Sequence, residues 1–307
     1  MIDTVNISLY TNEISERNIN ITNETINKQT GELGFYGFLG NLRVKKDGNN
    51  IFISNSLCKY YLGNSLNTLS RNEIEKAIEK LSDELEIPLR TLLDGNLTRI
   101  DIGENFIMKE PLQVYYNSFG AHQNSTLKKT IYNNNESLYY QNKSKSKCLA
   151  LYDKINESKE KRVKIPDHLK NKNLLRIEYR LQKRIKNTLK VNPVFVKNLL
   201  EEKFYTKLIE LWKTTYFQIE RLQKYKMNSE ENMEMNFKLI QDLSLINYIN
   251  QMGGLEIASQ QFQLPKQTKY RLRKKIKEIE QKPNLFIEND SLKELDEKVN
   301  WAAKYYR

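Results

Sequence analysis

Short runs in which apolar and polar residues alternate dominate the chain from Ile2 to about Leu181. Near the N-terminus, Val5, Ile7 and Leu9 fall on one face of an extended segment because successive strand side chains point to opposite sides. Further on, two short apolar runs flank the dipeptide Asp-Gly at 47–48, which is typical of a β-hairpin. The pattern predicts several strands joined by short turns.

Helical spacing interrupts this pattern once and then takes over from about Val194. Ser70 and Glu73 form a capping-box pattern at the start of the first helix. Apolar residues follow at helical spacing: Ile74, Ala77, Ile78, Leu81 and Leu85. We therefore expect an α+β fold, with an antiparallel-sheet domain over residues 1–190 and a mostly α-helical C-terminal domain over residues 191–307.

Two of the later predicted strands carry charge on the face opposite their apolar residues. They span residues 98–103 and 175–181, and each has isoleucine, leucine or tyrosine at alternate positions. The intervening polar positions are Arg99, Asp101, Arg176, Glu178 and Arg180. Each strand thus has one face for a core and one polar face.

A third strand, residues 137–141, contains two adjacent tyrosines. Alternation places Tyr139 and Tyr140 on opposite faces, so the two phenols cannot serve the same site. Lys154 follows the next alternating run. If these strands are neighbours in one sheet, Asp101, Glu178, one tyrosine and Lys154 converge on a single polar face.

Positive charge is concentrated in one part of the chain. The formal net charge is +12, and residues 143–190 alone hold 16 Lys or Arg against 5 Asp or Glu. Such clustering indicates a polyanionic partner such as DNA. The phosphate-binding candidates in this block are Lys143, Lys145, Lys147, Arg176 and Arg180.

The polar face suits phosphodiester chemistry. Asp101 and Glu178 can hold Mg²⁺ or Mn²⁺, because hard divalent ions prefer oxygen ligands and accept water and phosphate oxygens in the remaining positions. A tyrosine can attack phosphorus as a covalent nucleophile, with Lys154 easing its deprotonation.

Simpler interpretations of the same residues remain open. Asp101 and Glu178 can equally be ordinary strand carboxylates that form ion pairs with Arg99 and Arg176. A tyrosine on a strand is most often a packing residue, and the lysine/serine segment at 143–147 can be a surface loop.

The C-terminal part shows two long amphipathic patterns, Phe204 to Tyr225 and Met233 to Met252. Residues 255–277 then read as a helix, a tight turn and a basic helix, which is the outline of a helix-turn-helix near 253–280. Lys266, Lys269 and Arg273 are its candidate DNA contacts. A plain helical bundle with a solvated basic helix is the alternative.

Several classes of protein are excluded or disfavoured. Cys58 and Cys148 lie in no metal-ligand spacing, and the two histidines are far apart, so neither a zinc site nor a paired-histidine metal site is expected. The sequence has no long apolar run and no signal-peptide pattern at its start. We expect a cytoplasmic protein that does not bind membranes.

Three motifs in order carry a resemblance to a known family. They are RIDIGENF at 99–106, SLYYQNKSKSKCLALYDKINE at 137–157 and LLRIEYRL at 174–181. Together with the opening MIDTV, they resemble the replication initiators of the filamentous-phage gene II/X family. They are similar, more distantly, to the Rep_trans initiators of small Gram-positive rolling-circle plasmids.

The resemblance implies roles for individual residues. Tyr139 matches the nucleophilic tyrosine, Asp101 and Glu178 match the metal-binding carboxylates, and Tyr152, Lys154 and Glu157 match a Y-x-K-Glu element of that family. Gln141 stands where the family pattern has a glycine after the tyrosine pair. The choice between Tyr139 and Tyr140 therefore stays open at this point.

The hypothesis from sequence is a rolling-circle replication initiator that nicks one origin strand, forming a 5′-phosphotyrosine and a 3′-OH primer, and later rejoins the strand. Its expected partners are double-stranded and extruded single-stranded origin DNA, a host helicase and polymerase, and a second copy in a homodimer. The alternatives are a non-catalytic origin- or operator-binding protein that uses the C-terminal helices, and a metal-dependent nuclease without a covalent step.

Overall fold

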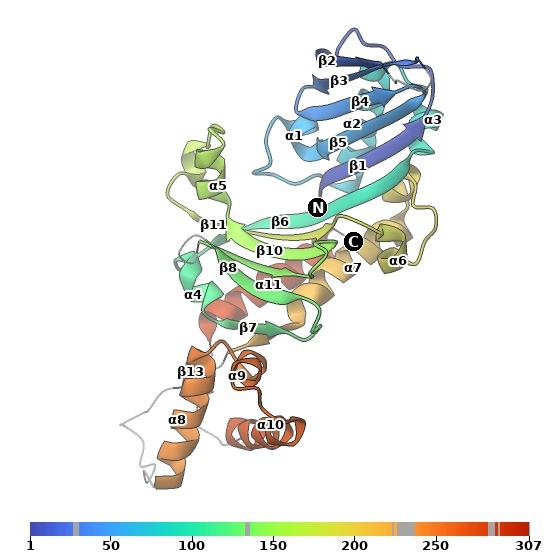
Figure 1. Ribbon diagram of the computed structural model, residues 1–307. Coiled ribbons are helices and arrows are strands. Elements are labelled where there is room, and N and C mark those ends of the chain that lie inside the picture. Colours follow the sequence, from blue (N-terminus) through green and yellow to red (C-terminus); the bar gives the residue numbers. More distant parts are fainter. Residues whose placement is uncertain are drawn as a thin grey trace.

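The computed structural model describes residues 1–26, 31–132, 136–222, 224–225, 237–281, 286–287 and 289–306. Within these residues, ten strands form one antiparallel sheet that runs through most of the molecule (Figure 1). From edge to edge its strands are β2 (Asn20–Ile26), β3 (Leu33–Leu39), β4 (Leu42–Asp47), β5 (Asn50–Ser56), β1 (Ile2–Tyr10), β6 (Asn96–Met108), β11 (Asn173–Leu181), β10 (Lys147–Asp153), β9 (Ser137–Gln141) and β8 (Lys128–Tyr132). The predicted α+β class is confirmed.

The hairpin expected around Asp47-Gly48 is the β4–β5 pair, in which Asp47 faces Asn50. Gly48 has a φ of +57°, a backbone conformation that glycine adopts without the strain of a side chain. Short helices connect the remaining strands: α1 (Leu57–Leu62), α3 (Leu89–Leu93), α4 (Leu112–Tyr116), α5 (Lys154–Glu160), η1 (Asp167–Leu169) and α6 (Ile185–Leu189).

The helix predicted after Ser70 is α2 (Arg71–Leu85). Its capping box is formed: the Glu73 backbone N–H donates to Ser70 Oγ, and the Ser70 backbone N–H donates to Glu73 Oε2 at 2.8 Å. The apolar positions predicted from helical spacing are all buried in the main core. Capping and packing therefore agree on where this helix lies.

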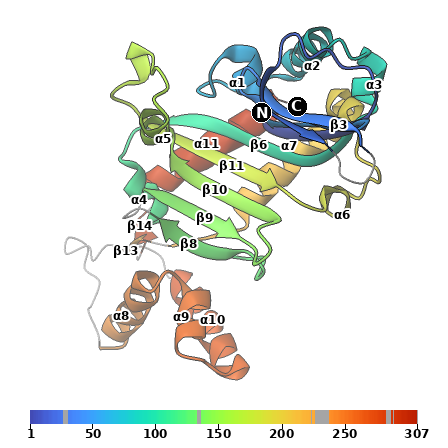
Figure 2. The ribbon, with the colours of Figure 1, turned by 45° about the horizontal axis from the view of Figure 1, so that its top comes forward.

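The main core continues through helices that follow residue 190. η2 (Val196–Leu200), α7 (Glu202–Phe217) and α11 (Asp290–Tyr305) contribute buried residues to the same core as the strands. The indole of Trp212 on α7 donates a hydrogen bond to the Ile177 carbonyl of β11 at 3.2 Å. In Figure 2, α7 and α11 cross behind β6, β11, β10 and β9. These helices lie within residues 191–307, the range predicted to be a mostly α-helical domain, and they cover one face of the sheet.

The helix predicted over residues 204–225 ends at Phe217, because Ile219–Arg221 (β12) instead pairs with Phe119–His122 (β7). The two-residue strands Lys224–Tyr225 (β13) and Phe286–Ile287 (β14) also pair. They lie at the two ends of the segment formed by residues 226–285.

That segment contains α8 (Phe237–Gln251), α9 (Leu255–Gln261) and α10 (Lys266–Glu280). We call these three helices the C-terminal module. Figure 1 shows it projecting from one end of the molecule. Its small core consists of Leu239, Leu243, Ile246 and Ile279. The helix predicted over Met233 to Met252 corresponds to α8, except that residues 233–236 lie outside the described residues.

No helix within the described ranges is long and apolar enough to cross a membrane.

Candidate active site

The polar face predicted from alternation exists, because the strands that carry it are neighbours in the order β6, β11, β10 and β9. Their register aligns the side chains in rows. One row runs Gly103, Glu178, Ala150 and Tyr139, and the next contains Asp101 and Arg180. Figure 2 looks onto this face of the strands, on the side away from α7 and α11.

A pocket of about 390 Å³ opens over these rows. Two small residues, Gly103 and Ala150, flank Glu178, so the middle row leaves space above the sheet. At Gly103 a side chain would come within 3.2 Å of Glu178 Cβ, which is tighter than ordinary contact. The pocket lining includes four carboxylates and five cations: Asp3, Asp101, Glu157, Glu178, Lys59, Arg99, Lys154, Lys161 and Arg180. We call this the site pocket.

Asp101 lies on β6 at the floor of the site pocket and is only 1% exposed. Arg99, two residues earlier on the same strand face, donates to both of its carboxylate oxygens, with Nε at 2.9 Å from Oδ1 and NH2 at 2.5 Å from Oδ2. Burial raises the pKa of Asp101 to about 7, Arg99 opposes that shift, and the charge of Glu178 adds to it. Asp101 therefore exchanges its proton near neutral pH.

Glu178 lies on β11 and is almost completely buried. Its Oε2 accepts hydrogen bonds from Arg180 NH2 at 2.9 Å and from the Tyr152 hydroxyl at 3.0 Å. Burial favours the neutral acid, but the charges of Arg180 and Arg176 outweigh it and hold the pKa of Glu178 well below its usual value. The two carboxylates thus have very different proton affinities, although they share one pocket.

Tyr139 lies on β9 and is half-buried at the edge of the site pocket. The Arg180 guanidinium lies 5.7 Å from the centre of the Tyr139 ring. Burial raises the pKa of the Tyr139 phenol, while Arg180 opposes that shift. Arg180 is therefore a cation placed beside this phenol, whereas the sequence led us to expect Lys154 in that role.

Tyr140 points to the opposite face of the same strand. It is 0% exposed, and its hydroxyl donates to the Gly120 carbonyl at 2.7 Å. Burial raises its pKa well above the usual value. The two tyrosines that the sequence could not rank lie in different environments, and only Tyr139 faces the carboxylates.

Lys154 enters the site pocket at the junction of β10 and α5. Asp153 caps α5 by accepting hydrogen bonds from the backbone N–H groups of Ile155 and Asn156 at 2.8 and 3.0 Å, which fixes the first turn. The Lys154 ammonium is buried and donates to Glu157 Oε2 at 2.9 Å. Burial lowers the pKa of Lys154, although Glu157 opposes the shift. The Y-x-K-Glu element therefore forms one wall of the pocket.

Asp3 is a pocket residue that sequence reasoning missed. Strict alternation puts Asp3 on the same face as Val5, Ile7 and Leu9, which is the core face. A β-bulge between Ile2 and Val5 changes this, because three steps along β1 match two steps along β6. Asp3 therefore reaches the site pocket, where its Oδ1 accepts from Ser56 Oγ at 2.5 Å.

Arg176 differs from the sequence expectation of a phosphate contact. Its guanidinium is 0% exposed and donates to Asp3 Oδ2 at 2.8 Å and to Asn105 Oδ1 at 3.1 Å. It also lies 3.6 Å from Glu178 Oε2. Arg176 offers no surface to DNA in this arrangement. Its role in the structure is to balance the negative charge of the buried carboxylates of Asp3 and Glu178.

The hairpin lysines, Lys143, Lys145 and Lys147, lie in and beside the β9–β10 turn. Lys143 and Lys145 are exposed and Lys147 is half-buried. Gln141 faces Cys148 across the hairpin, and Arg180 lies on the other side of Cys148. The turn thus places positive charge next to the row that contains Asp101 and Arg180.

The site pocket contains the two carboxylates, Asp101 and Glu178, that are expected from the sequence to hold a divalent metal. Within the described ranges no group of three or more His, Cys, Asp or Glu side chains is arranged to hold a metal ion. Two carboxylates with water and phosphate oxygens are sufficient for Mg²⁺. Burial is the main reason that the pKa of Asp101 is raised, and the charge of Glu178 adds to it; a cation between Asp101 and Glu178 would favour the ionised form of Asp101. The arginines bound to both carboxylates would have to share their oxygens with such an ion.

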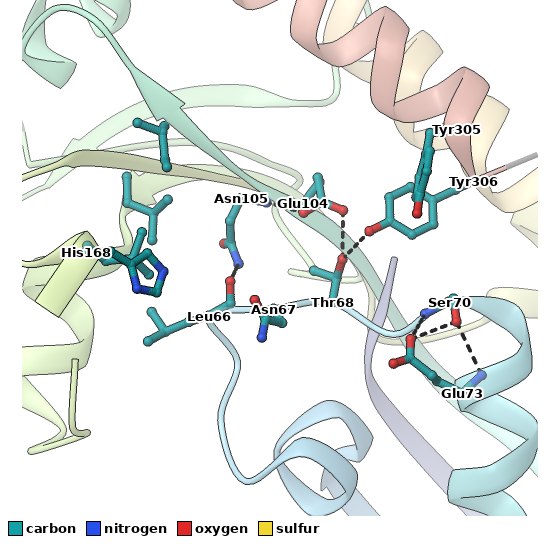
Figure 3. Close-up of a pocket in the computed structure, with 13 residues that line it drawn as sticks. Leu66, Asn67, Thr68, Ser70, Glu73, Glu104, Asn105, His168, Tyr305 and Tyr306 are labelled. Carbon is teal, nitrogen blue, oxygen red and sulfur yellow. Dashed lines mark hydrogen bonds between the residues drawn. The ribbon is translucent and has the colours of Figure 1, made fainter. Parts of the chain in front are cut away.

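A second pocket, of about 620 Å³, lies on the other side of the segment that contains Ser65 and Leu66. Figure 3 shows the Thr68 hydroxyl between Glu104 and Tyr306, with donor–acceptor distances of 2.7 and 2.9 Å. The carboxylates that line it are Glu73 and Glu104, and His168 lines it as well. Although larger, this pocket is unsuited to a phosphate group.

A comparison with known families is decisive for the class of protein. Residues 1–202 match the family described as the N-terminal part of the phage replication-associated protein of the gene II type. The chain belongs to this family. The match runs from β1 to the first residue of α7, so it includes every strand that lines the site pocket.

The replication-initiator family match agrees with the resemblance read from the three motifs, and it establishes a replication-associated role. No curated protein matches the chain. The C-terminal module and α11 lie beyond the matched residues.

Proposed function

We propose that this replication initiator nicks one strand of its origin DNA through Tyr139, with Mg²⁺ or Mn²⁺ held by Asp101 and Glu178. The observation that carries the proposal is the placement of Tyr139. It is the member of the tyrosine pair that faces the site pocket, where its ring lies beside Arg180.

In the proposed reaction, the phenol oxygen of Tyr139 attacks phosphorus and the bond from phosphorus to the 3′ oxygen breaks. The phenol loses a proton and the departing 3′ oxygen gains one, so the products are a 5′-phosphotyrosine and a free 3′-OH. Arg180 stabilises the phenolate as it forms, and Arg99 and Lys154 offset the negative charge that develops on the phosphate. The metal ion, when bound, polarises the phosphodiester. Attack by a 3′-OH on the phosphotyrosine reverses the step and rejoins the strand.

The test uses single-stranded oligonucleotides with a random central region and a label at the 3′ end. A 5′-phosphotyrosine joins the protein to the DNA on the 3′ side of the cut, so only a 3′ label follows the adduct. We expect a labelled, denaturant-resistant band with Mn²⁺, which disappears in EDTA and in Tyr139→Phe.

Tyr140→Phe is the matched control. It removes the hydrogen bond to Gly120 and should cost about 1 kcal/mol of stability, but the adduct should remain. If Tyr139→Phe keeps the adduct and Tyr140→Phe loses it, the nucleophile is the neighbour. If both keep it, the tyrosine mechanism is wrong.

The C-terminal module supports a second candidate, a DNA-binding protein without catalysis, because α9, a turn and the basic α10 have helix-turn-helix order. The same experiment separates the candidates. Binding without any cleavage supports this second function. Metal-dependent cleavage without an adduct supports a nuclease that uses water as its nucleophile.

A further inference from the structure

The basic helix α10 has two different faces. Residues 266–277 contain seven Lys or Arg and no Asp or Glu. Sequence alone could not divide these cations, because their spacing covers the whole helix circumference. The packing of α10 on α8 and α9 divides them.

The inner face of α10 is occupied by contacts within the module. Ile279 packs in the small core. Lys269 and Arg273 both donate to the carboxylate of Glu256 in the first turn of α9, Arg273 at 2.5 Å. Lys275 pairs with the buried Asp242 of α8 at 2.8 Å. Two of the three cations expected to contact DNA, Lys269 and Arg273, therefore pair with α9, although the Arg273 side chain remains 51% exposed.

The outer face carries a different row of side chains. Gln267, Tyr270, Arg271 and Lys274 follow one another at spacings of three, one and three residues, which places them in one stripe of an α-helix. All four are exposed, and Tyr270 is 67% exposed. The stripe ends at Glu278, whose charge opposes close approach of phosphate.

We propose that this outer stripe binds the major groove of double-stranded DNA and reads its sequence, while Lys269 and Arg273 pair with Glu256 of α9 and do not contact bases. The groove is about 12 Å wide and admits an α-helix with its side chains. Gln267 has the paired donor and acceptor that suit adenine, and Arg271 has the paired donors that suit guanine. Lys274 and Lys266 supply charge for the flanking phosphates. The absence of acidic residues over three turns favours DNA over a basic or neutral protein partner.

Selection from a library of random 20-base-pair duplexes tests this proposal. The full chain is used in EDTA, so the outcome is independent of metal-dependent nicking at the site pocket. We expect one enriched motif. Arg271→Gln should relax one base position and lower the motif-over-random affinity ratio about tenfold, which corresponds to about 1.4 kcal/mol. Gln267→Ala should relax a different position.

Arg273→Gln is the matched control, because it removes the same charge from the inner face. It should lower the melting temperature of the module but leave the motif-over-random ratio unchanged. An equal loss of ratio in Arg273→Gln and Arg271→Gln overturns the assignment of faces. Failure of the wild-type chain to enrich any motif overturns sequence reading by α10, even if the nicking reaction is intact.

Discussion

Replacing Asp101 by Asn should change how the stability of the protein depends on pH. The Asp101 carboxyl is buried, and its pKa rises from 3.8 to about 7 on folding. Between these two values the folded state holds a proton that the unfolded state has lost, so stability falls as pH rises through this window. Well above pH 7 the Asp101 carboxyl is ionised in both the folded and the unfolded state, so stability falls no further. Asn has no proton to lose, so the variant lacks this dependence.

The size of the effect follows from the shift. Each pKa unit is worth about 1.4 kcal/mol, so the window from pH 5 to pH 7 contributes about 3 kcal/mol. Solvent does not screen this carboxyl appreciably, because Asp101 is only 1% exposed. Glu178 does not add to the window, because its arginine partners keep it ionised at these pH values. The free energy of unfolding of the wild type, relative to Asp101→Asn, should fall by this amount between pH 5 and pH 8.

Urea unfolding in EDTA at pH 5 and pH 8 measures the difference directly. Asp94→Asn is the control, since Asp94 is an exposed carboxylate paired with Lys197 and its pKa is lowered, so its contribution is constant across this window. A stability difference between wild type and Asp101→Asn that is the same at both pH values would refute the assigned pKa shift. At pH 8, Mn²⁺ at 100 times its dissociation constant should stabilise the wild type by about 2.7 kcal/mol and Asp101→Asn by much less.

Three further outcomes are expected. Tyr139→Phe should abolish the covalent adduct and change DNA affinity less than twofold in a filter-binding titration, because it removes a hydroxyl and no cation; a large loss of affinity would contradict this. Glu178→Gln should abolish Mn²⁺-dependent nicking and destabilise the protein by about 3 to 5 kcal/mol, because it removes a buried carboxylate that Arg176 and Arg180 share; a variant of wild-type stability, measured by thermal melting, would refute the charge argument. Changing the hairpin lysines to Gln should weaken binding to every sequence and flatten the slope of log K against log salt by about 0.7 per lost contact to single-stranded DNA; an unchanged slope would show that these lysines do not touch phosphate.

The sequence predicts which face of each strand is polar, but not which strands are neighbours. Alternation places Asp101 and Glu178 on non-core faces, and Tyr139 and Tyr140 on opposite faces, because it depends only on adjacent residues. Their meeting in one pocket depends on pairing between β6 and β11, which are more than sixty residues apart in the chain. From the sequence this pairing was only a condition, because periodicity does not say which strands are neighbours.

Two features of the site could not be predicted from the local sequence pattern. The bulge in β1 reverses the face of Asp3 by inserting one residue, and nothing in the strand's apolar spacing marks it. The burial of Arg176 depends on Asp3 and Asn105, which come from two other strands. A strand arginine in an alternating pattern has the same local sequence whether its polar face is open or covered.

Local sequence patterns also do not show how the helices after residue 190 pack against the sheet. Helical periodicity correctly marks α7, but it does not say which surface this helix covers. Both α7 and α11 join the core beneath the site pocket, so the strand that holds Asp101 is supported by helices that begin only at Glu202 and Asp290.

The positions of the two candidate DNA-binding surfaces suggest different demands on the structure. The site pocket rests on strands of a large sheet, where neighbours on both sides and helices behind fix each side chain, and the proposed nicking reaction requires this rigidity. The apolar cluster between the helices of the C-terminal module contains four buried side chains among the residues described, and ion pairs between these helices add to its support. Sequence reading by an exposed helix stripe tolerates such a small core, because the helix needs only to present its side chains to the groove. A change in base preference can therefore arise on α10 without disturbing the rows of side chains over the sheet.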